Sequence, residues 1–301
     1  MSVAVSHMST DRSWRMPAVI LVAAALASTA PLTVLLIGPL VLGVPHVVGD
    51  LRVLWLGRPG GFGGQAAWLT ATALLAMTVL RGATMADGVP RLQYELLCGL
   101  AAVAVATWAG ATTPRRRAAM VLPLLVAAWS CWRFPRECVL ALAHGHNAVA
   151  LVLWIVWNRS RSESLGVAGT YVLSAAWVVF VSDASVVGAV LGGLDGTQMH
   201  RELAPSLSVD LADAVVRSFA FAQLVHYGIW SWNLPGGTRW ELRSHLGSTA
   251  LGACVFVALA VPLLGSIAPA ETRQAYLQAV LAHGWLELAV AAYLLAKGSR
   301  P

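Results

Sequence analysis

Long apolar segments, separated by short clusters of arginine, run through the whole sequence and limit what it can fold into. Hydrophobic residues make up 58% of the 301 residues, and charged residues make up only 11%, against about 25% charged residues in an ordinary soluble domain. A segment of about 20 apolar residues is long enough to cross a membrane as a helix. The sequence therefore predicts an all-α integral membrane protein, built as a polytopic helical bundle.

About ten transmembrane segments can be drawn on this basis. Pro31 is expected to separate the first two, and Pro45 to kink the second, because proline removes a backbone donor and disrupts the preceding turn. The polar stretches between segments are short, so we expect a single transmembrane domain over residues 1–301. The predicted segments are 16–30, 32–56, 65–82, 93–112, 118–134, 138–157, 166–194, 211–233, 246–267 and 275–296.

The positions of the basic residues predict the orientation. If the N-terminus lies in the cytoplasm and the segments alternate, thirteen of the 20 Lys and Arg residues fall on the cytoplasmic side and seven on the outer side. This bias follows the positive-inside rule and predicts cytoplasmic termini. We assign the protein to the inner (plasma) membrane of a bacterium, with membrane lipids as its surroundings. The net charge of +6 is explained by these clusters, so we expect no nucleic-acid partner.

Histidines inside the apolar segments are the main functional signal. An ionisable side chain within a membrane costs free energy and marks a functional site by default. Four of the apolar segments carry one, and these four segments would all run in the same direction, so their side chains can face a shared interior. The candidate metal ligands are His46, His144, His146, His226 and His283.

Two of these histidines have a carboxylate one helical turn later, Asp50 after His46 and Glu287 after His283. Residues four apart share one face of a helix. A carboxylate there can coordinate a metal or orient a ligating imidazole, so both acids are candidate catalytic residues. Histidines and carboxylates without a thiolate cluster are typical of Fe(II), and less so of Zn or Cu.

Several other residues have competing interpretations. A single histidine in a membrane helix is often only an interhelical hydrogen-bonding group. Trp230 and Trp285 follow two of the histidines closely and are candidates for the wall of a cofactor or substrate pocket, with ordinary packing as the alternative. For Asp183, pairing with a histidine, lining a polar pathway and satisfying a kinked helix are all open. We expect the histidines in loops or tails to be ordinary surface residues, namely His7, His200 and His245.

The segment GVPHVVGD, with Gly43, Pro45, His46 and Asp50, resembles the opening signature of the Brp/Blh family of membrane β-carotene cleavage enzymes. The general plan, a polytopic helical chain with histidines on several helices, is similar too. The resemblance implies a mononuclear non-haem iron oxygenase with His46 as a ligand. Two features depart from the family pattern: Val47-Val48 replace its Gly-Ala, and its later HxxxH pair is absent.

Three functions are consistent with these observations. The first is a membrane metal-dependent oxidoreductase, such as a dioxygenase, acting on a lipid-soluble substrate that could be a carotenoid, another isoprenoid or an acyl chain. The second is a haem-binding electron carrier, because transmembrane histidines are typical axial ligands. The third is a proton-coupled transporter, because intramembrane His, Asp and Glu can form proton relays.

Overall fold

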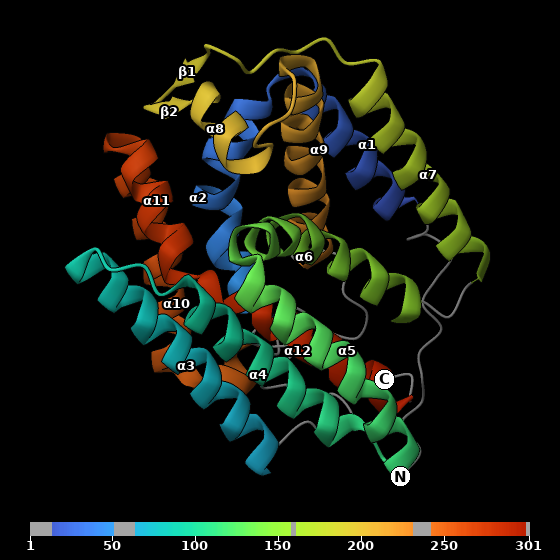
Figure 1. Cartoon of the computed structure of the whole chain (residues 1–301). Helices are drawn as coiled ribbons and strands as arrows, with labels where there is room; N and C mark the ends of the chain where they lie inside the picture. Colours follow the sequence, from blue (N-terminus) through green and yellow to red (C-terminus); the bar gives the residue numbers. More distant parts are fainter. Residues whose placement is uncertain (1–13, 51–63, 158–160, 231–241, 299–301) are drawn as a thin grey trace.

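The computed structural model describes residues 14–50, 64–157, 161–230 and 242–298, apart from the side chains of residues 48–50, 156–157, 161 and 242–251. Within these ranges the chain is almost entirely helical (Figure 1). The helices are α1 Arg15–Thr29, α2 Pro31–Asp50, α3 Gly64–Asp87, α4 Leu92–Gly110, α5 Pro114–Arg133, α6 Pro135–Trp157, α7 Arg161–Phe180, α8 Gly196–Leu203, α9 Val209–Gly228, α10 Leu242–Ile267, α11 Pro269–Ala279 and α12 Leu281–Lys297. A small antiparallel hairpin pairs β1 (Val190–Leu191) with β2 (Leu194–Asp195).

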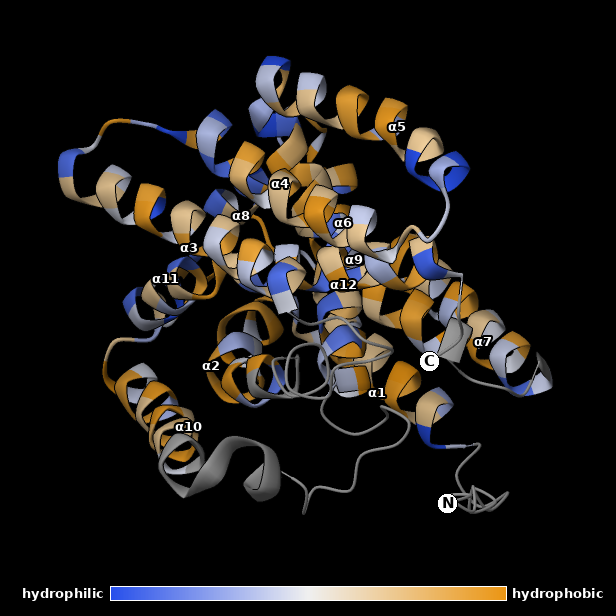
Figure 2. Ribbon diagram, turned by 90° about the horizontal axis from the view of Figure 1, so that it is seen from below, coloured by the Kyte–Doolittle hydropathy of each residue, from blue (hydrophilic) through white to orange (hydrophobic). Residues whose placement is uncertain are grey.

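The outer surface of the bundle is apolar. Large hydrophobic side chains point outward along many of the helices, among them Trp68 (73% exposed), Leu173 (73%) and Phe256 (71%), and Figure 2 shows hydrophobic residues along most of the ribbon. Contiguous exposed apolar surface of this extent suits contact with lipid, not water. Within the described residues, five helices are long and apolar enough to cross a membrane, and these are Gly64–Asp87, Leu92–Gly110, Pro135–Ile155, Ser162–Phe180 and the combined Pro269–Lys297. The protein is therefore an integral membrane protein.

Helix α9 is the buried axis of one half of the bundle. It packs against α1, α2, α6, α7 and α8, and Figure 1 shows it upright between α2 and α1. Its buried side chains include the polar and charged residues Asp213, Arg217, Gln223 and His226. Buried polar groups need partners, so α9 determines where the polar chemistry of the interior takes place.

Proline shapes the neighbouring helix α2. Pro39 and Pro45 lie inside it, and proline cannot donate the hydrogen bond to the carbonyl four residues earlier. The carbonyl of Leu35, which Pro39 leaves without a helical donor, accepts a 2.7 Å hydrogen bond from the buried Arg273 Nε of α11. The two helices also approach closely at Gly43, where an added Cβ would lie only 2.4 Å from the Tyr276 hydroxyl. These contacts attach α11 to α2.

The all-helical prediction is confirmed, and so is the separation of the first two segments, since α1 ends at Thr29 and α2 begins at Pro31. The predicted segment 166–194 is wrong at its end. Helix α7 stops at Phe180, and Asp183 lies in the connection that follows, outside any helix. The predicted loop 195–210 contains helix α8. The last predicted segment is longer than expected, because α11 and α12 run from Pro269 to Lys297 with a break at Val280.

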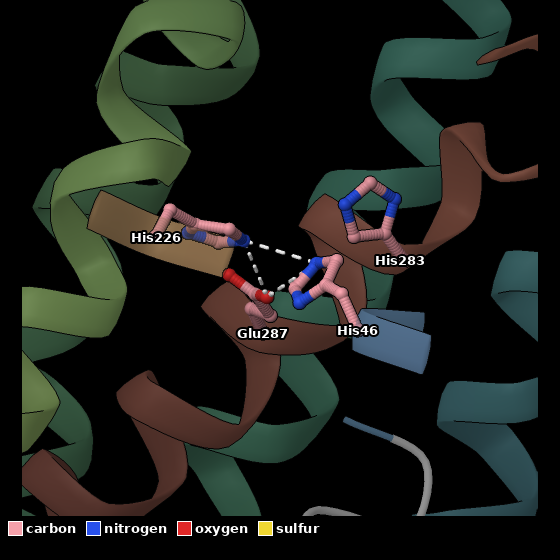
Figure 3. A group of neighbouring side chains, drawn as sticks. All are labelled: His46, His226, His283 and Glu287. Carbon is pink, nitrogen blue, oxygen red and sulfur yellow. Dashed lines mark hydrogen bonds and ion pairs between the residues drawn. The ribbon is translucent and has the colours of Figure 1, made fainter. Parts of the chain in front are cut away.

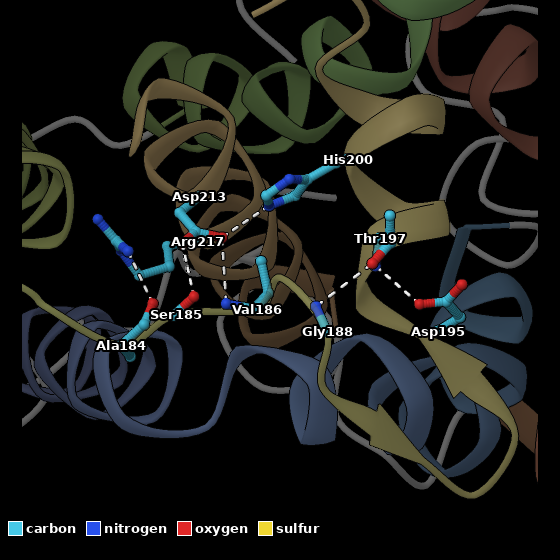
Figure 4. A network of polar contacts seen from close by, with 9 residues as sticks. All are labelled: Ala184, Ser185, Val186, Gly188, Asp195, Thr197, His200, Asp213 and Arg217. Carbon is cyan, nitrogen blue, oxygen red and sulfur yellow. Dashed lines mark hydrogen bonds and ion pairs between the residues drawn. The ribbon is translucent and has the colours of Figure 1, made fainter. Parts of the chain in front are cut away.

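Residues 181–208, which carry the hairpin and α8, form a cap at one end of the bundle. Asp213 of α9 holds it by accepting three hydrogen bonds, from His200 Nε2 (2.6 Å), Ser185 Oγ (2.9 Å) and the Val186 amide (3.1 Å). One turn later, Arg217 donates to the carbonyl of Ala184 (Figure 4) and to that of Val178. The expectation that His200 is a surface residue is therefore wrong: it is only 9% exposed, because it is the buried partner of Asp213.

Candidate metal centre

Four side chains from three helices meet inside the bundle, namely His46 of α2, His226 of α9, and His283 and Glu287 of α12 (Figure 3). One nitrogen or oxygen atom from each lies within 4.8 Å of all the others. The Nε2 atoms of His46 and His226 are 3.0 Å apart. Glu287 Oε1 lies 3.3 Å from His226 Nε2 and 3.7 Å from His46 Nε2. These four residues are called the central cluster below.

The separations have the size expected between ligands of one ion. Two ligand atoms that are each about 2.1 Å from a metal lie about 3.0 Å apart at a right angle and about 3.4 Å apart at the tetrahedral angle. The three measured separations of 3.0, 3.3 and 3.7 Å cover this range. The atoms of His46, His226 and Glu287 are therefore close enough to share one metal ion, and His283 offers a nitrogen within 4.8 Å of each of them.

The three histidines lie at a common depth in the bundle because each follows the start of its helical segment by a similar number of residues. His46 lies fifteen residues after Pro31, His226 seventeen after Val209, and His283 fourteen after Pro269. The sequence alone places the start of the last segment near residue 275 and His283 about 10 Å too shallow. The additional turn and a half of α11 removes this mismatch.

Local helix geometry orients His283 and Glu287. His283 lies in the first turn of α12, and its Nδ1–H donates to the carbonyl of Val280 at the helix break (2.5 Å). A donor at Nδ1 leaves the lone pair on Nε2 for a metal, which is the usual way in which a protein fixes a ligating imidazole. Glu287 follows one turn later on the same face, as predicted from the sequence, and is completely buried.

The central cluster lacks the hydrogen bonds that such a group would need by itself. Among the residues that the structure describes, neither carboxylate oxygen of Glu287 accepts a hydrogen bond, and the Nδ1 atom of His226 has no hydrogen-bond partner. A buried carboxylate without a counter-charge or donors is strongly unfavourable. A divalent cation among these four side chains would compensate the carboxylate and use the nitrogen lone pairs.

His146 of α6 lies beside the central cluster. The centroid of its ring is 5.2 Å from that of His226 and 5.6 Å from that of His283. Its Nδ1–H donates to the Leu142 carbonyl (3.1 Å), so its Nε2 also carries a free lone pair. The ring lies close to α12, since a Cβ at Gly284 would be 3.6 Å from it, at ordinary contact distance. His146 therefore borders the site from a fourth helix.

His144 is not part of the cluster, although it was predicted with the others. Its Nε2–H donates to the Leu203 carbonyl at the end of α8 (3.1 Å), and its ring packs against Phe219. The carbonyls at a helix C-terminus have no partners within the helix. His144 therefore attaches the cap to α6.

The two predicted tryptophans lie in different surroundings. Trp230 is buried, with its ring centroid 6.2 Å from that of His46, and its indole Nε1 has no hydrogen-bond partner within the described ranges. Trp285 packs against α4, where a Cβ at Gly99 would fall 2.3 Å from the indole. Trp230 thus lines the site, whereas Trp285 serves helix packing. The Asp50 side chain and all of His7, like the side chain of His245, lie outside the described residues.

Sequence reasoning did not identify Tyr227, a polar residue next to the site. Tyr227 is buried with its ring centroid 5.2 Å from that of His46, and its hydroxyl accepts a hydrogen bond from Gln223 Nε2 (3.1 Å). With His226 and Trp230 they occupy positions i, i+3, i+4 and i+7 of α9 and the turn that follows it, which form one face of a helix. That spacing is the signal that could have identified Tyr227.

Comparisons with known proteins give no further guidance: no family model, curated protein or solved structure matches this chain.

Proposed function

We propose that this protein is an integral-membrane, metal-dependent oxidoreductase that uses the central cluster to hold one Fe(II) ion and acts on a lipid-soluble substrate. The observation that carries the proposal is the meeting of three imidazoles and one carboxylate at ligand distances in the interior of the bundle. A site made only to stabilise the bundle would satisfy its own polar atoms, whereas in the described parts of the chain Glu287 accepts no hydrogen bond.

The donor set supports iron as the metal. Imidazole suits Fe, Zn, Cu and Ni, and sites with a few histidines and one carboxylate are typical of non-haem Fe(II) oxygenases. None of the four cysteines belongs to the group of candidate ligands. When bound, such an ion supplies the binding and activation of dioxygen. The residues would hold the ion, and the buried surroundings would keep water away from the reaction.

The proposed substrate is lipid-soluble because the protein presents apolar surface on its outside and has its candidate site in the middle of the bundle. The resemblance of GVPHVVGD to the Brp/Blh signature favours a carotenoid or another isoprenoid over an acyl chain. His46, the residue that this resemblance assigns to the metal, is one of the four members of the cluster.

The geometry argues against haem at this position. Two axial histidines must leave room for the porphyrin between them, which requires their nitrogens to be about 4 Å apart, twice a metal–nitrogen bond. The facing nitrogens of His46 and His226 are 3.0 Å apart, and the ring of His283 fills the adjacent space, 5.2 Å from that of His46.

One observation favours the transporter as a second candidate. The span that carries His283 is broken at Val280, and α2 contains Pro39 and Pro45 near His46. Discontinuous helices around an intramembrane polar site are typical of transport proteins. A transporter would move the metal or protons through this site, whereas an oxidoreductase would retain the ion during turnover.

The test uses purified protein loaded with Fe(II) under anaerobic conditions and then mixed with oxygenated buffer and β-carotene or another isoprenoid in detergent. The expected result is oxygen consumption with a cleaved or oxygenated product, which His226→Ala abolishes and His144→Ala leaves within a few-fold of the wild type. Metal-loaded protein that consumes no oxygen, but releases ⁵⁵Fe across a proteoliposome membrane, would instead establish the transporter.

A further inference from the structure

Arg273 is a buried cation that lies well away from the central cluster. It is on α11, within the candidate membrane span Pro269–Lys297, and only 7% exposed. It bonds to α2 at Leu35, eleven residues before His46, which corresponds to about 16 Å along a helix. An ionisable residue in such a segment is expensive to bury and marks a functional site by default.

The contacts of Arg273 use little of its bonding capacity. A guanidinium offers five N–H donors in a planar fork. In this structure Nε donates to the Leu35 carbonyl, and Nη2 lies 4.0 Å from the sulfur of Met199, a weak acceptor. Within the described ranges, no carboxylate forms an ion pair with Arg273. The nearby acid of α8, Glu202, is exposed and accepts a hydrogen bond from Gln198.

The other partly or fully buried charges in these parts of the chain are differently placed. Arg81 forms an ion pair with the buried Glu95 at 2.6 Å. Arg217 donates to two carbonyl oxygens, those of Val178 and Ala184. Arg273 differs from both, because within the described residues it has one carbonyl acceptor and, as its other contact, only the weakly accepting thioether of Met199.

Arg273 of α11 contacts α2 at Leu35 and α8 at Met199, and Figure 1 shows these three helices next to one another at the cap end of the bundle. The turn of the hairpin covers this region. A Cβ at Gly192 would fall 2.9 Å from Leu36 and 3.2 Å from Pro269, and Gly192 has φ +54°. Met199, whose sulfur faces the guanidinium, has an unbranched and flexible side chain that can be displaced.

We propose that Arg273 is the anchor of a binding site for an anionic amphiphile at the cap end, whose carboxylate or phosphate takes the place of the Met199 sulfur beside the guanidinium. Arginine is suited to this role because its fork binds both oxyanions in a bidentate manner. The apolar chain of the ligand would lie against the lipid-facing surface. The ligand is a free lipophilic acid or the head group of an anionic phospholipid.

The first test measures binding to wild-type protein in neutral detergent with chain-matched probes, so that it does not depend on any variant. Oleate is compared with oleyl alcohol, and dioleoyl phosphatidylglycerol with dioleoyl phosphatidylcholine. Since a hydrogen-bonded charge contributes about 1.5–3 kcal/mol, the site predicts at least about a tenfold preference for one anionic probe over its uncharged or zwitterionic counterpart. Preference for oleate identifies a free acid, and preference for phosphatidylglycerol a phospholipid.

The second test assigns the preference to Arg273. Arg273→Gln alone would leave the Leu35 carbonyl without its donor and could destabilise the fold. The double variant Pro39→Ala/Arg273→Gln avoids this, because an alanine in place of Pro39 restores the helical N–H to that carbonyl. The controls are Pro39→Ala alone and Arg201→Gln, which changes an exposed arginine of α8.

The expected result is a loss of the preference in the double variant and its retention in both controls. Equal binding of charged and uncharged probes by the wild type would overturn the proposal. So would a preference that persists in a folded double variant. Metal content is expected to stay at the wild-type level throughout, so failure here leaves the central cluster unaffected.

Discussion

The central cluster and the cap network are both buried groups of histidine and carboxylate, and helix α9 contributes to both, yet they are built differently. In the cap, Asp213 accepts three hydrogen bonds from His200, Ser185 and a backbone amide. In the central cluster, Glu287 accepts none from the described residues, and two imidazole nitrogens face each other at 3.0 Å.

The difference separates a structural network from a site for a ligand. A carboxylate that is fully hydrogen-bonded needs nothing more, and the cap network holds residues 181–208 against α9. A fully buried carboxylate that accepts no hydrogen bond is costly unless a cation compensates it, and a metal ion among these imidazoles would do so. Four substitutions test whether the central cluster binds metal while the cap network only stabilises the fold, and their expected effects decrease from His226→Ala to Gly284→Ala.

His226→Ala is expected to have the largest effect, because it removes a central ligand with contacts to both His46 and Glu287. Loss of an outer partner of a ligand already lowers metal affinity about 10–100-fold, so we expect at least about a 100-fold loss here. The measurement is metal competition with a chelator of known affinity. His144→Ala is the matched control and should bind as the wild type does; equal loss in both would mean that the metal does not use the central cluster.

Asp213→Ala is expected to destabilise the protein without changing its metal content. It leaves a histidine, a hydroxyl and an amide of the cap without their acceptor, and an unsatisfied buried donor costs about 1–3 kcal/mol. The measurement is the thermal unfolding temperature in detergent, next to Asp210→Ala, which removes an exposed acid of the same helix. If Asp213→Ala released the metal at an unchanged unfolding temperature, the two regions would not be independent.

His146→Ala is expected to have an intermediate effect on the metal. The ring borders the cluster but does not belong to its four closest side chains, so we expect roughly a tenfold loss of affinity. The visible absorption of Co²⁺-substituted protein should shift at the same time, because the surroundings of the ion change. An unchanged spectrum and affinity would remove His146 from the site and leave the other four residues in place.

Gly284→Ala is expected to have the smallest effect. A Cβ at this position would lie 3.6 Å from the His146 ring, at ordinary contact distance. Metal affinity should stay within about threefold of the wild type. Gly99→Ala is the informative comparison, since its Cβ would overlap Trp285 at 2.3 Å and should lower the unfolding temperature. If Gly284→Ala lowered the unfolding temperature more than Gly99→Ala does, the α6–α12 contact would be tighter than the α4–α12 contact.

Much of the fold could be predicted from the sequence, because apolar segment length and proline positions act locally. The same holds for the pairing of His283 with Glu287, which depends only on helical spacing. The sequence could not show that His144 contacts α8 instead of the cluster, because both roles suit a histidine in an apolar helix. The burial of His200 could not be predicted either. Its polar surroundings in the sequence resemble a loop, and its partner Asp213 is known only from the structure.

The most direct test of the central claim is the metal content of the protein purified without chelators, combined with X-ray absorption at the edge of the metal found. We expect about one equivalent of metal, with a shell of nitrogen and oxygen ligands at about 2.0–2.2 Å and the outer scattering of several imidazoles. Less than a tenth of an equivalent, even after incubation with Fe(II), Zn²⁺ or Co²⁺, would contradict the account, and so would a shell without imidazole.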